Sequence, residues 1–218
     1  MENILKKIFI SIAGLVLFST LLISCSNFNV FRDITFGSDM ENIENILSQN
    51  GIKYKTYPAA PFIDSIDLEN PEEIAEHIVK NSATGFLGDM LYKESVFYKQ
   101  NINGPTFETL IYFFKGKCTN IYLTWYLKNN LSLRNGFLAS EKLMTYINQQ
   151  YPDLKFEPAE TELGGKKYIM QVSDTVSITI QANEESLYCD MEDAVLQKPY
   201  KELKEQVDAL VKDYKGKK

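Results

Sequence analysis

The segment from residue 107 to residue 127 constrains the fold of this chain more than any other stretch. Aromatic and β-branched residues dominate two runs, 107–114 and 117–127, which are separated only by Lys115-Gly116. Two strand-like runs joined by a two-residue turn that contains glycine are typical of a β-hairpin. The pattern therefore predicts an antiparallel sheet that includes this hairpin.

The second arm of the hairpin changes its alternation near its start. Its apolar residues share one face only if an extra residue bulges out near Thr119 or Asn120. Those apolar residues are Cys118, Ile121, Leu123 and Trp125. We therefore expect a β-bulge at the beginning of this strand.

Helix-type and strand-type patterns alternate along the rest of the chain. Ser38 and Glu41 have the spacing of a capping box, which predicts a helix that ends at Asn50-Gly51. Further helices are expected from Asn70-Pro71, over 140–150, and from Pro199 onward, where an amphipathic stripe begins. Further strands are expected over 52–57, 90–99, 167–172, 176–182 and 186–191.

These elements predict the α+β class, with an antiparallel sheet, helices packed on one face and a C-terminal amphipathic helix. Helix followed by strands occurs twice, which is compatible with two divergent units over 31–128 and 137–198. We expect a signal peptide over 1–24, a tether over 25–30, the α+β domain over 31–198, and a final helix with a basic tail over 199–218.

The N-terminal segment has the layout of a secretory signal. Lys6 and Lys7 form a positive region, and the uncharged apolar run 8–23 follows. This run is a little short for a transmembrane helix, which needs roughly 20 apolar residues, so cleavage is favoured over insertion.

The end of this signal resembles that of the bacterial lipoprotein family. Leu22, Ile23 and Ser24 fit the lipobox, and Cys25 fits its acceptor cysteine. The resemblance implies that Cys25 is lipidated and becomes the first residue of a protein held in the cell envelope, on the outer or the cell membrane, facing away from the cytoplasm. Several acyl chains give stable anchoring, whereas one chain binds a membrane only marginally.

Composition describes an ordinary acidic globular domain. Residues 1–24 carry Lys6, Lys7 and Glu2, a net charge of +1, so their removal changes the formal charge from −6 to −7. With 44% hydrophobic and 24% charged residues, the chain can bury a core. An acidic exported domain is a poor nucleic-acid binder, so we expect no nucleic-acid partner.

Cys118 and Cys189 are the cysteines that remain after Cys25 is assigned to lipid. In an exported protein two arrangements are open. They pair as a disulfide, or they are two separate buried thiols that pack as small apolar side chains.

The sequence holds no recognisable catalytic set. His77 is the only histidine, which excludes a histidine-based metal cluster, and the Gly-rich turns lack phosphate-loop spacing. The acidic residues Asp64, Asp67 and Glu69 lack the glycine turn of a calcium loop, so a solvated loop is favoured there. We expect no catalytic residue, metal or cofactor.

Aromatic residues between Tyr92 and Tyr126 are too numerous for all of them to face inward. One interpretation is a sheet covered by helices and its own loops. The other is an exposed binding face for a protein, peptide or glycan, because tyrosine and tryptophan are favoured in binding surfaces. The candidate residues for that face are Tyr112, Tyr122, Trp125 and Tyr126.

The mature chain also has a looser resemblance. The order of segment 31–37, a capped helix and an aromatic strand entered through residues 113–117 resembles uncharacterised bacterial lipoproteins. It is similar to the β-lactamase-inhibitor-like architecture, shared with the small lipoprotein of the outer-membrane assembly machine. Known members bind proteins without catalysis, and no functional residue carries over. We expect a non-catalytic envelope-binding protein; the alternatives are a hydrolase with paired carboxylates and a solute-capturing lipoprotein.

Overall fold

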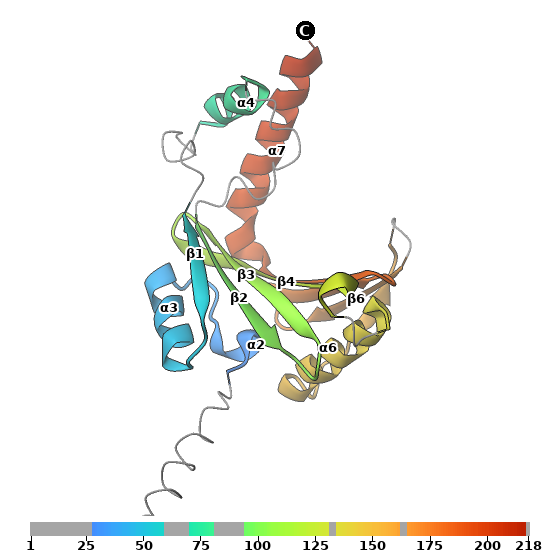
Figure 1. The fold of residues 1–218 in the computed structure, drawn as a ribbon. Helices are drawn as coiled ribbons and strands as arrows, with labels where there is room; N and C mark the ends of the chain where they lie inside the picture. Colours follow the sequence, from blue (N-terminus) through green and yellow to red (C-terminus); the bar gives the residue numbers. More distant parts are fainter. Residues whose placement is uncertain (1–27, 59–69, 81–93, 131–133, 162–164, 217–218) are drawn as a thin grey trace, which may run out of the picture.

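A computed structural model shows how the chain folds, and it describes residues 28–58, 70–80, 94–130, 134–161 and 165–216. Eight antiparallel strands form one sheet in the order β1-β2-β3-β4-β8-β7-β6-β5 (Figure 1). The strands are β1 (Tyr54–Pro58), β2 (Glu94–Asn101), β3 (Thr106–Phe114), β4 (Lys117–Tyr126), β5 (Glu157–Ala159), β6 (Lys166–Gln171), β7 (Val176–Ala182) and β8 (Ser186–Asp193). The described helices are α2 (Val30–Asp33), α3 (Met40–Gln49), α4 (Pro71–Lys80), the 3-10 turn Leu127–Asn129, α6 (Gly136–Gln150) and α7 (Ala194–Gly216). The predicted α+β class is confirmed.

The strand order is symmetric about the pair of β4 and β8. Helix α3 precedes the strands β1 to β4, and helix α6 precedes the strands β5 to β8. The two sets of strands join through antiparallel pairing of β4 with β8. One hydrophobic core contains residues from both halves, so the two helix-then-strands units form a single packed body.

The β3–β4 hairpin forms as the sequence predicts. Lys115 and Gly116 both have positive φ angles, 50° and 73°, as a type I′ turn requires. The pairing register shifts so that Tyr112 faces Asn120 while Phe113 faces Cys118, which leaves Thr119 as an extra residue. The expected bulge is therefore confirmed, and it puts the apolar residues of β4 on one face.

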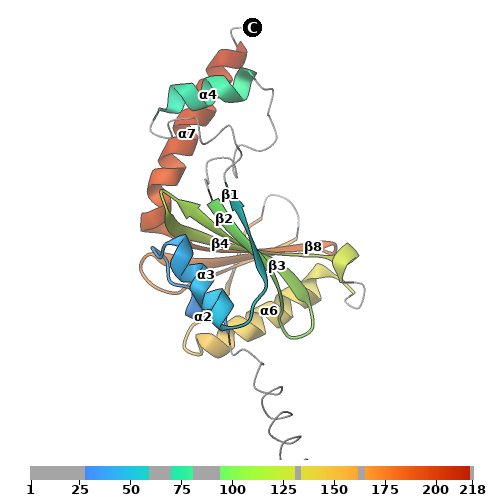
Figure 2. The ribbon, with the colours of Figure 1, turned by 60° about the vertical axis from the view of Figure 1, so that its left-hand side comes forward.

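Helices α2, α3 and α6 cover one face of the sheet (Figures 1 and 2). We call these three helices the helix layer. Ile43 and Leu47 of α3, with Leu143 and Ile147 of α6, are fully buried against the strands. Burying such side chains supplies the main favourable contribution to folding, about 1.5–3 kcal/mol for each large apolar side chain. The helix layer is therefore held mainly by apolar contacts with the sheet.

Helix α6 begins against the turn between β7 and β8. Asn135 caps the helix by accepting a hydrogen bond from the backbone N–H of Leu138, 3.0 Å away. Gly136 lies so close to the backbone carbonyl oxygens of Asn183 and Ser186 that a Cβ atom there would overlap both. The helix was expected to begin at 140, and the cap by Asn135 explains its earlier start at Gly136.

The packed body begins before the position that the sequence suggested. Phe28, Asn29 and Val30 were expected in the tether, yet all three are buried. Asn29 accepts a hydrogen bond from the backbone N–H of Phe31 and so caps α2. The prediction of a tether over 25–30 is therefore wrong for these three residues, because apolar side chains and a helix cap draw them into the core.

Helix α7 begins at Ala194, not at Pro199. Asp193 caps it, with the carboxylate accepting from the backbone N–H groups of Val195 and Leu196 at 2.9 and 3.1 Å. Gln197, which is fully buried, donates a hydrogen bond to the hydroxyl of the bulged Thr119 at 3.3 Å. Because of the cap and this contact, the helix begins five residues before Pro199, the position at which proline alone would start it.

The outer part of α7 leaves the sheet and packs against α4, on the opposite side from the helix layer (Figures 1 and 2). A second core joins the two helices to the end of the β3–β4 hairpin. Its buried residues are Ile74, Ala75, Ile78, Phe114, Tyr200, Leu203, Val207 and Val211. Within the described residues, no helix is both long enough and apolar enough to cross a bilayer.

The structure differs from the sequence predictions at two further points, the cap of α3 and the strand β5. Helix α3 is capped by Asp39, which accepts from the backbone N–H of Asn42 at 2.9 Å, so Ser38 is not the cap. The short strand β5 was not expected, because Pro158 breaks the strand pattern and the strand has only three residues.

Candidate functional site

The face of the sheet opposite the helix layer, which we call the outer face, carries one continuous row of side chains across all eight strands. Each member of this row lies opposite the next in the pairing register. From β1 to β5, the row is Lys55, Phe97, Leu110, Tyr122, Asp190, Thr179, Ile169 and Glu157. The residues that alternate with them, such as Ile121 and Cys189, lie in the core under the helix layer. The row therefore marks the middle of the outer face.

Tyrosine rings gather on the outer face at the centre of the sheet. The rings of Tyr122 and Tyr188 stack, with centroids 6.1 Å apart and planes at 22°. Tyr126 meets the edge of Tyr188 at 6.0 Å, and 36% of its surface is exposed. We call these three residues the tyrosine cluster. Strand pairing holds it in place, because β4 supplies two of its members and β8 supplies the third.

The carboxylates around this cluster differ in their bonding partners. Glu108 of β3 forms an ion pair with Lys99 at 2.8 Å, and Glu192 of β8 forms one with Lys201 of α7 at 2.8 Å. Asp190 lies between them on the same face, and its hydrogen-bond donor is the side-chain amide of Asn120. Two carboxylates thus have a lysine partner, and the one beside Tyr122 has an amide.

Burial changes the acidity of the groups at this point. Removal of Asp190 from water raises the pKa of its carboxyl to about 6, although the hydrogen bond from Asn120 acts in the opposite direction. Burial, followed by the nearby Tyr188, raises the pKa of Tyr122. Tyr122 therefore stays neutral near pH 7, whereas Asp190 titrates just below neutrality.

The structure brings together most of the residues predicted for the binding face. Tyr112, Tyr122 and Tyr126 lie on the outer face, with Tyr112 buried at its edge nearer α7. Trp125 lies on the other face, under the helix layer, and only 1% of its surface is exposed. Its assignment to this face is wrong. Side chains alternate between the two faces along a strand, so Trp125 lies on the face opposite to Tyr122 and Tyr126.

Sequence reasoning missed several members of this surface. Phe97, Leu110, Tyr188, Asp190 and Asn120 were not assigned to it. Alternation in β8 is a signal that would have grouped Tyr188 with Asp190, since Leu187, Cys189 and Met191 form the other face. Their position beside Tyr122 depends on the pairing of β4 with β8, which no local pattern reveals.

Cys118 and Cys189 are separate buried thiols and do not form a disulfide. Cys118 faces Phe113 at the start of β4, whereas Cys189 faces Leu123 further along that strand. The register keeps them apart, although both point into the same core. Burial raises the pKa of Cys118 to about 12 and that of Cys189 well above its ordinary value. The second of the two open arrangements is therefore the observed one.

The remaining sequence candidates are not among the described residues that form this surface. Leu22, Ile23, Ser24 and Cys25 lie outside the described residues, as do Asp64, Asp67 and Glu69. His77 is a partly buried residue of α4 and is not a member of the row across the sheet. Within the described part of the chain, no three histidine, cysteine or acidic side chains are arranged to hold a metal ion.

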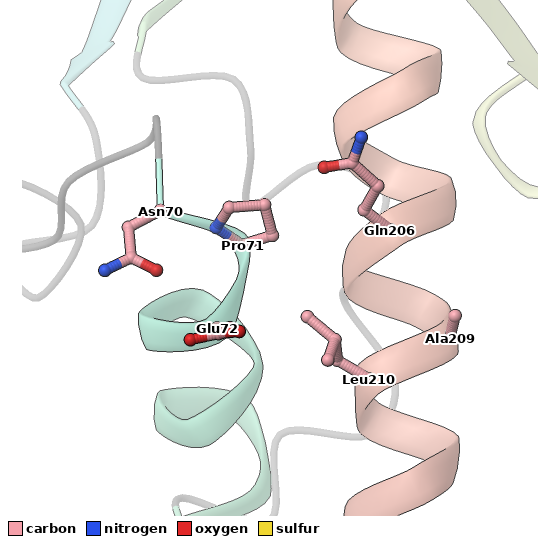
Figure 3. A pocket seen from close by; sticks show the side chains of 6 residues that line it. All are labelled: Asn70, Pro71, Glu72, Gln206, Ala209 and Leu210. Carbon is pink, nitrogen blue, oxygen red and sulfur yellow. The ribbon is translucent and has the colours of Figure 1, made fainter.

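Depressions lined by described residues lie at the margins of the molecule. One lies between the start of α4 and the outer part of α7, where Leu210 points toward α4 and Glu72 is the charged lining residue (Figure 3). Two others lie along the edge strands β1 and β5. None of these three is enclosed between the sheet and the helix layer, where a solute-capturing protein would need its cavity.

Comparisons of the chain with protein-family models, curated proteins and solved structures gave no match. The function is therefore inferred from the site itself.

Proposed function

We propose that this protein is a lipid-anchored component of a bacterial cell envelope that binds a partner through the outer face of its sheet. The anchor is the lipid on Cys25, and the partner is an envelope protein, peptide or glycan. The role is non-catalytic. The mature domain faces away from the cytoplasm, from either the cell membrane or an outer membrane.

The observation that carries this proposal is the tyrosine cluster on the sheet face that the helix layer leaves uncovered. Tyrosine contributes large, rigid contact area together with a polar tip, which suits a surface that alternates between solvent and a partner. Leu110 and Phe97 extend the same row with apolar surface that is only partly buried. A contiguous aromatic surface of this kind is typical of interaction sites.

The anchor is tested by radiolabelled palmitate and by the signal-peptidase inhibitor globomycin. We expect the wild-type chain to take up label and its precursor to accumulate under globomycin, whereas the Cys25→Ala variant does neither. Cys118→Ala is the matched control, because it removes a buried thiol and leaves the lipobox intact. Absence of label from the wild-type chain would exclude the lipid anchor.

The binding surface is tested by crosslinking in whole envelopes. We expect Tyr126→Ala to abolish a crosslinked product that the wild-type chain forms. Tyr168→Ala, on the helix-layer side of β6, is the control that removes the same side chain elsewhere. An identical set of products from wild type and Tyr126→Ala would remove the outer face as the binding surface.

An envelope hydrolase is a second candidate, because Asp190 has a raised pKa and Glu192 projects from the same face two positions along β8. The ion pair of Glu192 with Lys201 holds that carboxylate toward α7. Release of soluble fragments from purified envelope glycan, lost in both Asp190→Asn and Glu192→Gln, would favour the hydrolase over the binding protein.

A further inference from the structure

The negative charge of the Asp190 carboxylate has no directly bonded cation among the ion pairs of the described residues. It lies in the middle of the row across the sheet, between Tyr122 on β4 and Thr179 on β7. A partly buried carboxylate is costly unless a cation or several hydrogen-bond donors compensate it. Its donor here is the neutral amide of Asn120, while Lys99 and Lys201 are bonded to Glu108 and Glu192.

The tyrosine rings add to the negative potential at the same place. The faces of aromatic rings attract cations. Tyr122 faces Asp190 across the β4–β8 pair, and Tyr188, which stacks on Tyr122, precedes Asp190 by two positions on β8. The outward-facing residues of the described parts of β4, β7 and β8 in the paired region carry no lysine or arginine. Aromatic rings next to a carboxylate that is bonded to a neutral amide are an arrangement suited to recognise a positively charged group.

Resting on the binding function proposed above, we propose that the tyrosine cluster and Asp190 bind a lysine or arginine side chain from a basic segment of a partner protein. The cation lies against the rings of Tyr122 and Tyr188 and forms an ion pair with the carboxylate. Asn120 is a positioning residue, since its amide holds the carboxylate in place. The partner is thus a basic chain, complementary to the mature domain's formal charge of −7, which is the −6 of the whole chain less the +1 of residues 1–24.

The ionisable groups around Asp190 determine how binding depends on pH. They are Glu192 on its own strand, Tyr112 and Tyr122 on the neighbouring strands, Tyr188 beside it, and Lys201 of α7, which is bonded to Glu192. Burial raises the pKa of the Asp190 carboxyl to about 6. Acidification from pH 7.5 to pH 5 therefore removes the carboxylate that attracts the cation.

The test is calorimetric titration of the full chain in dodecyl maltoside micelles with acetylated tetra-arginine amide, at about 0.15 M ionic strength so that long-range attraction is screened. We expect Asp190→Asn to weaken binding by about tenfold or more, and acidification to pH 5 to weaken the wild type by about tenfold, since about one carboxyl in ten stays ionised one pH unit below its pKa. In Asp190→Asn the effect of acidification disappears. Tetra-glutamate and tetra-serine peptides bind to neither protein.

Glu157→Gln is the matched control. Glu157 is exposed at the β5 end of the same row, and the substitution removes the same charge from the same face. We expect its affinity for tetra-arginine to stay within twofold of the wild type. Equal weakening by Glu157→Gln and Asp190→Asn would show general charge attraction and would overturn the inference.

The remaining outcomes separate this inference from the proposed function. If tetra-arginine fails to bind while Tyr126→Ala still abolishes the envelope crosslink, the cation site is wrong and the binding surface stands. Tighter binding of a neutral glycan oligomer, or self-association of the chain that Asp190→Asn abolishes in sedimentation, would replace the basic partner with a sugar or a second copy. Loss of both readouts would overturn the binding surface itself.

Discussion

Tyr122 and Asp190 face each other across the β4–β8 pair, where the two halves of the sheet meet. Each half alone would expose one of these residues on an edge strand. Joining the halves makes the aromatic ring and the carboxylate neighbours at the centre of an eight-stranded surface. The most chemically distinctive part of the molecule is therefore a product of the pairing between the halves.

Replacement of Asp190 by asparagine should stabilise the folded protein at neutral pH. Because burial raises the folded-state pKa of this carboxyl from 3.8 to about 6, the ionised form is disfavoured in the native state. We expect a gain of about 1–2 kcal/mol in the free energy of unfolding at pH 7.5, measured by urea denaturation.

The pH dependence of that effect has a definite sign. The native state binds the proton more tightly, so the stability that the protonated Asp190 contributes is fully present below pH 3.8 and is lost as the pH rises through about 6. We expect the Asp190→Asn variant to lack this loss. A variant less stable than the wild type at pH 7.5 would mean that the ionised carboxylate supports the fold.

Trp125 should report on the core and not on the outer face. It is the only tryptophan and lies under the helix layer with 1% of its surface exposed. We expect short-wavelength native fluorescence, poor quenching by iodide, and no spectral change when tetra-arginine binds the outer face. Strong iodide quenching of the native protein would place this residue at the surface.

Truncation of neighbouring β4 side chains should give unequal costs. We expect Trp125→Ala to lower the free energy of unfolding by about 3–5 kcal/mol, because it leaves a cavity in a packed core. Tyr126→Ala removes a side chain that is 36% exposed and should cost less than about 1.5 kcal/mol. Similar losses, measured by urea denaturation, would contradict the assignment of the two residues to opposite faces.

Cys118 and Cys189 should react with thiol reagents only after the protein unfolds. Burial raises the pKa of both thiols, so little thiolate forms and little of it is accessible. We expect labelling by dithionitrobenzoate to follow the unfolding rate, with two thiols released in denaturant from the Cys25→Ala chain without prior reduction. Release of these thiols only after a reductant is added would indicate a disulfide.

Gly136 should tolerate no side chain. A Cβ atom at this position would overlap the carbonyl oxygens of Asn183 and Ser186, so α6 would have to move away from the β7–β8 turn. We expect Gly136→Ala to destabilise the protein by about 2–4 kcal/mol in urea denaturation. Gly216→Ala is the control, because it has open space and should change stability by less than about 0.5 kcal/mol.

Local patterns in the sequence were sufficient for the elements that depend on local chemistry. The turn at Lys115-Gly116, the stop at Gly51 and the proline start of α4 each follow from a backbone preference that one or two residues express. The bulge at Thr119 was also predictable, because alternation breaks at that point.

Long-range pairing explains what the sequence left open. Nothing near Asp190 indicates that it will face Tyr122, since the two strands are separated by α6 and three further strands. Alternation along β4 is enough to place Trp125 on the face opposite to Tyr122 and Tyr126. The prediction grouped all three because their aromatic side chains suit a binding surface, and it did not consider which face the helices cover. The side of the sheet that helices cover is decided by packing, which only the folded chain displays.

If the proposed lipid anchor is correct, the burial of Phe28 limits how far the protein can stand from a bilayer. If Cys25 carries the acyl chains, three Cα–Cα steps of 3.8 Å separate it from the buried Phe28, a reach of about 11 Å at most. Helix α2 begins at the same end of the molecule, so the helical side would rest near the lipid headgroups while the strands and α7 point into the aqueous space. A protein mounted in this way meets molecules that arrive from solution or from a facing surface, and neighbours embedded in the same leaflet reach only its underside.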